Sequence, residues 1–405
     1  MKQKLLLILA CLFLSPCLWA QSVEFDRYFT GGTLRLDCLR EGSAQGDTVW
    51  VEHWIDRQSD WFGSRTQLLD PFDNGDYRVV MRDAETGREL YSRGYSNLFR
   101  EYKDTPEGKT VKARFEETLL VPMPKGKVQI ALQKRDENMR LQDQTVVVFS
   151  GVKWSERGVK GSERTNDKDV SAKFDVAFVM QGFDDVPDAE YGKVCRRMEG
   201  VLFGKEPFRS HRDDFNLYFV KGDAGVEYNT FGADRYAMTF KVWQLHDVLG
   251  KTPCDHIIIV LNNEKYGGGA IYNFYSVTSL HKMAESVLPH ELGHGIGGLA
   301  DEYVDEDLSY SGLHRTKYEP LEPNITNLVD FKSKWQHLLP EGTPIPTPNV
   351  EVPRTENGPL GVYEGAGYSS KGVYRPTMHC MMRDYAPFCP VCRERLEAVI
   401  GLYNE

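Results

Sequence analysis

Residues 290–303 read HELGHGIGGLADEY, and this stretch decides how the rest of the chain is interpreted. An α-helix has about 3.6 residues per turn, so His290 and His294 lie one turn apart on the same face. Their imidazoles can therefore reach one metal ion. Glu291 is offset by about 100° from His290, so it borders such an ion without binding it. The pattern predicts a zinc site in which Glu291 is the catalytic residue that accepts a proton from water.

The apolar residues of the same helix occupy its opposite side. Leu288, Leu292 and Ile296 form a stripe about 200° around the helix from His290. We expect this stripe to pack inward while the histidines face a cleft. Glycines at 295, 297 and 298 are poor helix residues, so the helix should end there. A glycine at 297 also permits a sharp turn that returns a third ligand to the metal.

The third ligand has to come from the residues after these glycines. The metzincin pattern H-E-x-x-H-x-x-G-x-x-H places a histidine where this chain has Ala300, which cannot bind a metal. Asp301 follows directly, and a carboxylate oxygen is an acceptable zinc ligand. A role for Asp301 in a cap or turn is the non-functional alternative. The predicted metal ligands are His290, His294 and Asp301, and the rivals of Asp301 are Glu302, Asp305 and Glu306.

Together with YRPTMHCMMRDYAPFCPVCRE at 374–394, the opening stretch resembles the bacterial IgA peptidase family of metzincin-like zinc metallopeptidases. The resemblance extends over residues from about 23 to 405. It implies a metallopeptidase domain preceded by a β-rich domain, and a protein or glycoprotein substrate. Position by position, it implies zinc bound by His290, His294 and Asp301, with Glu291 as the catalytic acid and base. The family shares the departure from the broad metzincin pattern at Ala300 and Asp301.

Metzincins also have a methionine turn beneath the metal, and CMMRDY at 380–385 resembles it. Aligning Cys380 with the usual small residue makes Met382 the turn methionine. Met381 and Met378 are the other candidates, and ordinary core methionines are the alternative reading. The stretch between Asp301 and Met382 is longer than a minimal metzincin needs, so we expect it to shape one wall of the cleft.

The segment KYGGGAIYN at 265–273 precedes the histidine helix and has the pattern of an edge strand. Glycines allow another backbone to approach closely, and an extended peptide can add to an exposed sheet edge. Gly268, Gly269 and Ala270 are therefore candidate substrate-binding residues. A flexible glycine loop is the alternative.

The pattern of apolar residues along the chain changes near residue 174. Before residue 150, short runs rich in β-branched and aromatic residues are separated by turn signals, which predicts an antiparallel β-sandwich. After residue 174, apolar strands alternate with helical patterns, which predicts a metzincin-like α/β domain with a mixed sheet. The predicted fold class is α+β and multidomain: a signal peptide at 1–20, a β-sandwich accessory domain at 21–150, a linker at 151–173 and a zinc-peptidase domain at 174–405. Strands are expected at 48–55, 76–83, 87–95, 111–123, 127–135, 144–150, 174–183, 214–222, 252–263 and 265–279.

The amino terminus has the order of a signal peptide. Lys2 and Lys4 precede an apolar run that is too short to span a bilayer, and cleavage is expected after Ala20. We therefore expect an exported protein that is periplasmic, on the cell surface or secreted, with no transmembrane segment after the signal is removed. Cys11 follows Leu-Ala, so a lipoprotein is the alternative. The net charge of −10 argues against a nucleic-acid partner.

The cysteines and the metal site leave further alternatives. Cys389 and Cys392 form a CxxC that we expect to be a disulfide after export, while a structural zinc site with His379 and Cys380 is the alternative. The protein as a whole could instead bind glycan or protein with a degenerate metal site, or hydrolyse a non-peptide amide with zinc. The intact set of His290, Glu291 and His294 argues against a degenerate site.

Overall fold

The computed structural model describes residues 23–151, 170–305, 314 and 317–403. The expected signal peptide at 1–20 and most of the expected linker at 151–173 lie outside the described residues, as does Glu306. Among the helices of the described ranges, none is both long and apolar enough to cross a bilayer.

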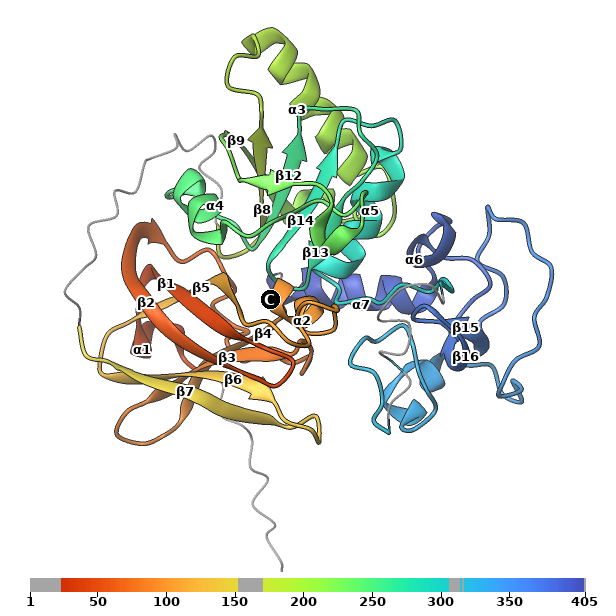
Figure 1. Ribbon diagram of the computed structural model, residues 1–405, viewed down its shortest axis with the longest axis horizontal. Helices are drawn as coiled ribbons and strands as arrows, with labels where there is room; N and C mark the ends of the chain where they lie inside the picture. The colour runs from red at the N-terminus through yellow and green to blue at the C-terminus, as the bar shows by residue number, and fades with distance from the viewer. Residues whose placement is uncertain (1–22, 152–169, 306–313, 315–316, 404–405) are drawn as a thin grey trace, which may run out of the picture.

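Two antiparallel sheets make up most of the amino-terminal part (Figure 1). One has the strand order β2-β1-β5 and the other has the order β4-β3-β6-β7. The central strand β1 was missed by the sequence prediction, although apolar and charged residues alternate along it. Two short helices, α1 and α2, flank the sheets. The elements are α1 (Phe25–Tyr28), β1 (Phe29–Ser43), β2 (Gly46–Asp60), β3 (Tyr77–Asp83), β4 (Glu89–Tyr95), α2 (Leu98–Tyr102), β5 (Ala113–Pro124), β6 (Val128–Arg135) and β7 (Leu141–Phe149).

A mixed five-stranded sheet with the order β13-β14-β12-β8-β9 forms the centre of the rest of the chain. Its strands are parallel except β13, which pairs antiparallel to β14 at one edge. The stretch 265–279, expected as one edge strand, is two strands, because the chain turns at Asn273 with a φ of 51°. The strands and first helices are β8 (Phe174–Gln181), α3 (Asp188–Leu202), β9 (Phe215–Lys221), β10 (Val226–Glu227), β11 (Met238–Thr239), α4 (Val242–Leu249), β12 (His256–Leu261), β13 (Gly269–Ile271), β14 (Tyr275–Ser279) and α5 (Ala284–Gly295).

The carboxyl-terminal part adds short elements around the end of α5. A hairpin of β15 and β16 is followed by two helices, and the buried Leu396 of the second belongs to the same apolar cluster as Leu288 and Leu292 of α5. These elements are β15 (Tyr363–Ala366), β16 (Ser369–Arg375), α6 (Met381–Asp384) and α7 (Pro390–Ile400). Single 3-10 turns lie at Arg212–Asp214, Thr230–Gly232, Phe331–Ser333, Trp335–Leu338 and Gly401–Tyr403.

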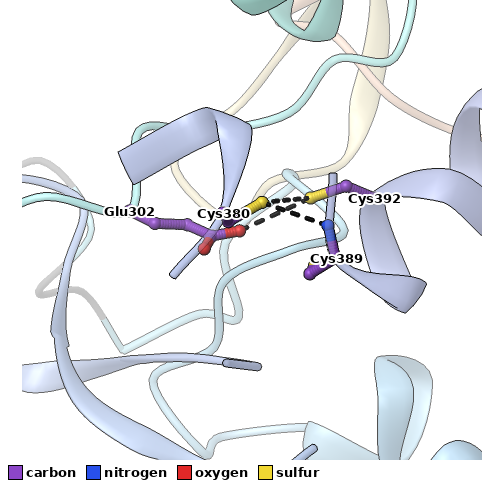
Figure 2. Close-up of side chains that lie close together, drawn as sticks. All are labelled: Glu302, Cys380, Cys389 and Cys392. Carbon is purple, nitrogen blue, oxygen red and sulfur yellow. Dashed lines mark hydrogen bonds between the residues drawn. The ribbon is translucent and has the colours of Figure 1, made fainter. Parts of the chain in front are cut away.

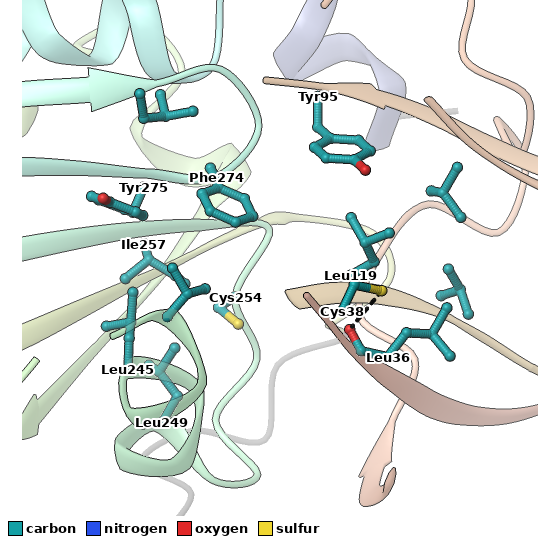
Figure 3. Close-up of a cluster of buried hydrophobic side chains, with 14 of the residues drawn as sticks. Leu36, Cys38, Tyr95, Leu119, Leu245, Leu249, Cys254, Ile257, Phe274 and Tyr275 are labelled. Carbon is teal, nitrogen blue, oxygen red and sulfur yellow. Dashed lines mark hydrogen bonds between the residues drawn. The ribbon is translucent and has the colours of Figure 1, made fainter. Parts of the chain in front are cut away.

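Both faces of the five-stranded sheet are buried, because its strands are apolar on both sides. In β8, Phe178 faces the cluster formed with α3, α5 and α7. The neighbouring Val179 faces the other cluster, which contains α4 and the apolar residues of both amino-terminal sheets. Figure 3 shows this second cluster, with Phe274 lying between the two parts of the chain. The amino-terminal sheets therefore share a core with the sheet that carries the histidine helix.

Polar contacts reinforce this shared core. The guanidinium of Arg93 donates to the backbone oxygen of Asp255 (3.0 Å) and to the side-chain oxygen of Asn273 (3.2 Å). Asn273 donates back to the backbone oxygen of Gly94 (2.7 Å). The ring of Tyr95 stacks on Phe274, with ring centroids 6.5 Å apart. These contacts hold the amino-terminal sheets against the turn between β13 and β14.

Helix α5 lies close to the sheet because it carries a glycine at the point of contact. A Cβ on Gly295 would lie 2.5 Å from Ser276 Oγ and 2.6 Å from His256 Cε1. As expected, the stripe of Leu288, Leu292 and Ile296 is buried, with at most 2% of each side chain exposed. The absence of a side chain at Gly295 therefore sets the height of the histidine helix above β12 and β14.

We expect Gly295→Ala to lower the free energy of unfolding by about 1–3 kcal/mol, because the added methyl group overpacks this contact. Gly200→Ala is the matched control, since Gly200 is also helical and its Cβ would meet nothing within 4 Å. Alanine should leave stability unchanged or raise it there by up to about 1 kcal/mol. Chemical denaturation of both variants measures the difference, and equal effects would contradict a steric role for Gly295.

His256 makes the same contact sensitive to acid. Burial lowers the pKa of this imidazole to about 3, and its Nε2 lies 2.8 Å from Ser276 Oγ. An unfolded histidine has a pKa of about 6.5. As the pH falls from about 6.5 towards 3, the unfolded chain takes up a proton that the folded chain does not, so the folded state loses stability. The stability that the uncharged His256 contributes to the folded state is fully present above pH 6.5.

His256→Gln should remove that part of the acid sensitivity. We expect the wild-type protein to lose roughly 2–4 kcal/mol more stability than the variant between pH 7 and pH 4, since one pKa unit corresponds to about 1.4 kcal/mol. Urea denaturation of both proteins at a series of pH values measures this difference in stability. Parallel stability curves for the two proteins would show that His256 does not titrate as its burial implies.

Candidate metal centre and its cleft

Helix α5 brings two imidazole nitrogens together. The Nε2 atoms of His290 and His294 are 3.2 Å apart, and their rings are nearly perpendicular, with an interplanar angle of 88°. His290 is buried, whereas His294 is partly exposed. The one-turn spacing in the sequence therefore does place both rings at the same point.

Backbone oxygens hold both rings from behind. His290 Nδ1 lies 3.0 Å from the backbone oxygen of Met381, and His294 Nδ1 lies 2.6 Å from that of Leu299. A carbonyl oxygen only accepts, so in the neutral form of each ring Nδ1 carries the proton and Nε2 offers a free lone pair. This is the tautomer that a metal-binding histidine needs.

Asp301 completes the group. Its Oδ1 lies 3.2 Å from His290 Nε2 and 3.4 Å from His294 Nε2. Its Oδ2 accepts a hydrogen bond from the Tyr368 hydroxyl (2.5 Å). Glu302, the rival ligand, is turned away and lies among buried cysteines. The left-handed residue of the glycine bend is Gly298, with a φ of 59°, rather than Gly297.

The donor set fits a dication. Asp301 Oδ1 is buried and has no hydrogen-bond partner among the described residues, which is costly for a carboxylate unless a cation compensates it. Burial opposes ionisation of Asp301, but without a metal the protonated forms of the two imidazoles outweigh it and hold the pKa of this carboxyl well below its usual range. Two nitrogens and one oxygen with free lone pairs thus converge on one buried point.

Glu291 borders this point without joining the group. A Cβ on Gly268 would lie 3.4 Å from Glu291 Cγ, so the glutamate projects towards the glycine-rich segment before β13. Burial raises the pKa of its carboxyl, while the charges of His290 and His294 oppose the rise. Glu291 and all three members of the group line one cleft.

This cleft has a volume of about 820 Å³ and three walls from distant parts of the chain. The first wall comes from the amino-terminal part and includes Asn97 and Glu101. The second follows the edge of the five-stranded sheet at Gly268–Ile271. The third comes from the long stretch after Asp301, at residues 319–322 and Tyr368. The expectation that this stretch forms a wall agrees with the structure, whereas the amino-terminal contribution was not foreseen.

The sheet edge is only partly open. The backbone of Gly268 is already paired with this chain, since its N–H donates to Arg235 O and its oxygen accepts from Ala237 N, both at 3.2 Å. Gly268 is therefore not a free edge residue, which corrects that part of the sequence interpretation. Gly269 and Ala270 belong to β13, the edge strand itself. Burial raises the pKa of Glu101 to about 7, and its carboxylate accepts a hydrogen bond from Tyr236 beside this edge (2.8 Å).

Met382 packs against the histidine helix at Gly293. A Cβ on Gly293 would lie 2.4 Å from Met382 Sδ, so the glycine of HELGH leaves room for this methionine. The preceding Met381 supplies the oxygen that holds His290. Met382 O in turn accepts a hydrogen bond from Glu302 N (2.8 Å). Met378 is only partly buried and does not make this contact.

Several cleft residues were missed by sequence reasoning. The ring of Tyr385 packs edge-on against His290 at 5.6 Å, and its hydroxyl lies 2.8 Å from that of Tyr266. Tyr368 occupies the tip of the β15–β16 hairpin beside Gly367, and both have positive φ. The run GAGYSSKG was a usable hairpin signal. No local pattern could have indicated that its tip reaches Asp301.

The expected disulfide of Cys389 and Cys392 is not present. The six cysteines within the described ranges are all free. Cys380, Cys389 and Cys392 instead lie with Glu302 in a second group of potential metal ligands. His379 is not part of it, because its Nδ1 is bound to Asp384 and its Nε2 lies 3.0 Å from Val352 O.

Comparison with known proteins agrees with this arrangement. Residues 24–145 match the family model described as Peptidase M64 N-terminus. Residues 221–358 and 352–400 match the model described as IgA Peptidase M64, and they contain every member of the metal group. A search of curated proteins gave no match. The two models together span most of the chain, and the chain therefore belongs to the IgA Peptidase M64 family, whose members are metallopeptidases acting on protein substrates.

Proposed function

We propose that the protein is an exported, zinc-dependent endopeptidase that hydrolyses peptide bonds of extracellular proteins or glycoproteins. The observation that carries this proposal is the convergence of His290 Nε2, His294 Nε2 and Asp301 Oδ1 within 3.4 Å of one another. Glu291 stands next to them in an open cleft. Residues 1–20 would serve as the signal peptide that directs export.

Zinc is the metal that this donor set favours. Two neutral imidazoles and one carboxylate are typical of catalytic zinc sites, which keep a further position for water or substrate. The backbone acceptors behind both histidines and the tyrosine behind the aspartate are the supporting contacts that such sites require. Bound there, zinc would supply Lewis acidity that lowers the pKa of water and polarises a peptide carbonyl.

Glu291 supplies the proton transfers. Its carboxylate accepts a proton from the attacking water and returns it to the leaving amine. Its place on the cleft wall keeps this carboxylate close to the reacting groups. The helix fixes its direction, because Glu291 is one residue from His290 and shares its rigid backbone.

The cleft suits an extended peptide better than a small amide. A volume of about 820 Å³ is large enough for several side chains. The edge at Gly269 and Ala270 supports pairing with a substrate backbone, while Gly268 is already engaged. The negative net charge of the chain disfavours nucleic acid as a partner. We further propose that Met382 is the methionine turn of a metzincin-like domain, and that the two amino-terminal sheets form a β-sandwich.

Glu291→Gln should abolish peptidase activity while metal content stays at the wild-type level, because the change removes the base and no ligand. We expect activity to fall by at least about 100-fold. Glu285→Gln is the matched control, since Glu285 is exposed on the first turn of the same helix. Wild-type turnover of a casein or peptide library by the Glu291 variant would remove this residue from the mechanism.

Removal of the metal from the wild-type protein with a chelator should stop turnover, and addition of zinc should restore it.

Tyr368→Phe should weaken metal binding by roughly 10- to 100-fold, because it removes the hydrogen bond that orients Asp301. Competition with a chromogenic chelator measures the affinity. Tyr363→Phe is the control, as it deletes a hydroxyl of the same hairpin that donates to Pro359 O (3.0 Å), away from the metal group. If both variants bind metal like the wild type, Tyr368 does not position the ligand.

A further inference from the structure

Four buried side chains converge behind the metal centre, from three separate parts of the chain. Glu302 follows Asp301 in the loop after α5, Cys380 precedes the two methionines, and Cys389 and Cys392 begin helix α7. None of the four is exposed to solvent at all. Each offers one donor atom, and these atoms all lie within 4.8 Å of one another (Figure 2).

From this juxtaposition we propose that Glu302, Cys380, Cys389 and Cys392 bind a second, structural zinc ion. Three thiolates and one carboxylate give the four protein ligands of a closed site, and a CxxC pair is a common part of such sites. This inference does not depend on the proposed peptidase activity, because it uses none of the catalytic residues.

The distances match tetrahedral coordination rather than a disulfide. Cys380 Sγ and Cys392 Sγ are 3.7 Å apart, whereas bonded sulfurs lie about 2.05 Å apart. Two sulfurs bound to one tetrahedral zinc at about 2.3 Å are separated by about 3.8 Å. Cys392 Sγ is also 3.4 Å from Glu302 Oε1. The group thus has the spacing of ligands around a common centre.

The surroundings of Glu302 give a second, independent reason to prefer a zinc site over a disulfide. Its Oε2 is fully buried and has no hydrogen-bond partner among the described residues, while its Oε1 accepts from Asn324 (2.9 Å). A disulfide between any two of the cysteines would leave this carboxylate buried beside one thiol. A zinc ion would instead bind the carboxylate and all three thiolates at once.

The start of helix α7 is suited to thiolates. Cys389 is the N-cap residue and Pro390 is the first helical residue, so the positive end of the helix dipole faces the sulfurs. The N–H of Cys389 points at Cys380 Sγ at 3.4 Å. Zinc binding would release the thiol protons, and each cysteine would then contribute its sulfur lone pair to the ion.

This second ion would tie together the parts that support the first. Glu302 adjoins the ligand Asp301, and Cys380 adjoins Met381, whose oxygen holds His290. Helix α7 reaches back to the glycine bend, because Arg395 Nε donates to Gly297 O (2.9 Å). The proposed zinc therefore acts as a cross-link beneath the catalytic centre.

Elemental analysis of the purified full-length protein and its variants tests the site. We expect two zinc ions per chain in the wild type, one in His294→Ala and one in Cys392→Ser. Cys38→Ser is the matched control, since Cys38 is equally buried but lies in the other core, and it should keep two. A Cys392 variant with as much zinc as the wild type would overturn the proposal.

Cobalt substitution of the His294→Ala variant decides the matter even if Cys392→Ser does not fold. Cobalt in the proposed site should give the intense sulfur-to-metal charge-transfer absorption of thiolate ligands. Absence of that band, or a disulfide among the three cysteines found by mass spectrometry, would refute the site. If the catalytic site were the one that fails, the wild type and His294→Ala would each hold one zinc and both would show the band with cobalt.

Discussion

Helix α5 packs directly on the five-stranded sheet, and the position of the two metal-binding histidines follows from this contact. Gly295 removes the side chain that would separate the helix from Ser276 and His256. Gly293 does the same on the side of Met382. Since the helix is held between strand and methionine with no intervening side chains, its two imidazoles occupy fixed positions. A metal centre needs this rigidity, because small displacements of ligands weaken binding.

The other supports of the centre come from loops that meet only in the folded protein. The hairpin tip at Tyr368 holds Asp301, and the segment at Met381 holds His290. Asp301 is followed in the chain by Glu302, and Met381 is preceded by Cys380, and the side chains of Glu302 and Cys380 meet again behind the centre. In our proposal a second zinc stabilises this meeting point. One catalytic ligand, Asp301, and one structural ligand, Glu302, would then be neighbours in the chain.

The amino-terminal sheets contribute to the site as well as to the core. They share one apolar cluster with the peptidase sheet, and Arg93 and Tyr95 contact the turn between β13 and β14. Glu101 then reaches the cleft and is bound by Tyr236. A part of the chain that contains none of the metal ligands therefore lines the cleft. The boundary of the accessory domain near residue 150 and the linker after it remain predictions.

The relative placement of the residues in the HELGH motif could be predicted from the amino-acid order alone. Helical periodicity places His290, Glu291 and His294 relative to one another, and the glycines after them end the helix, because these are properties of short backbone stretches. Runs of β-branched, aromatic and apolar residues bounded by turn signals likewise indicated most strands, although β1 was missed and the segment at 265–279 was taken as one strand. Only the tertiary structure decided which acidic residue completes the metal group, where the three cysteines meet and which walls enclose the cleft. Those outcomes depend on contacts between residues far apart in the chain, such as Asp301 with Tyr368 and Glu302 with Cys392, and local spacing carries no information about such contacts.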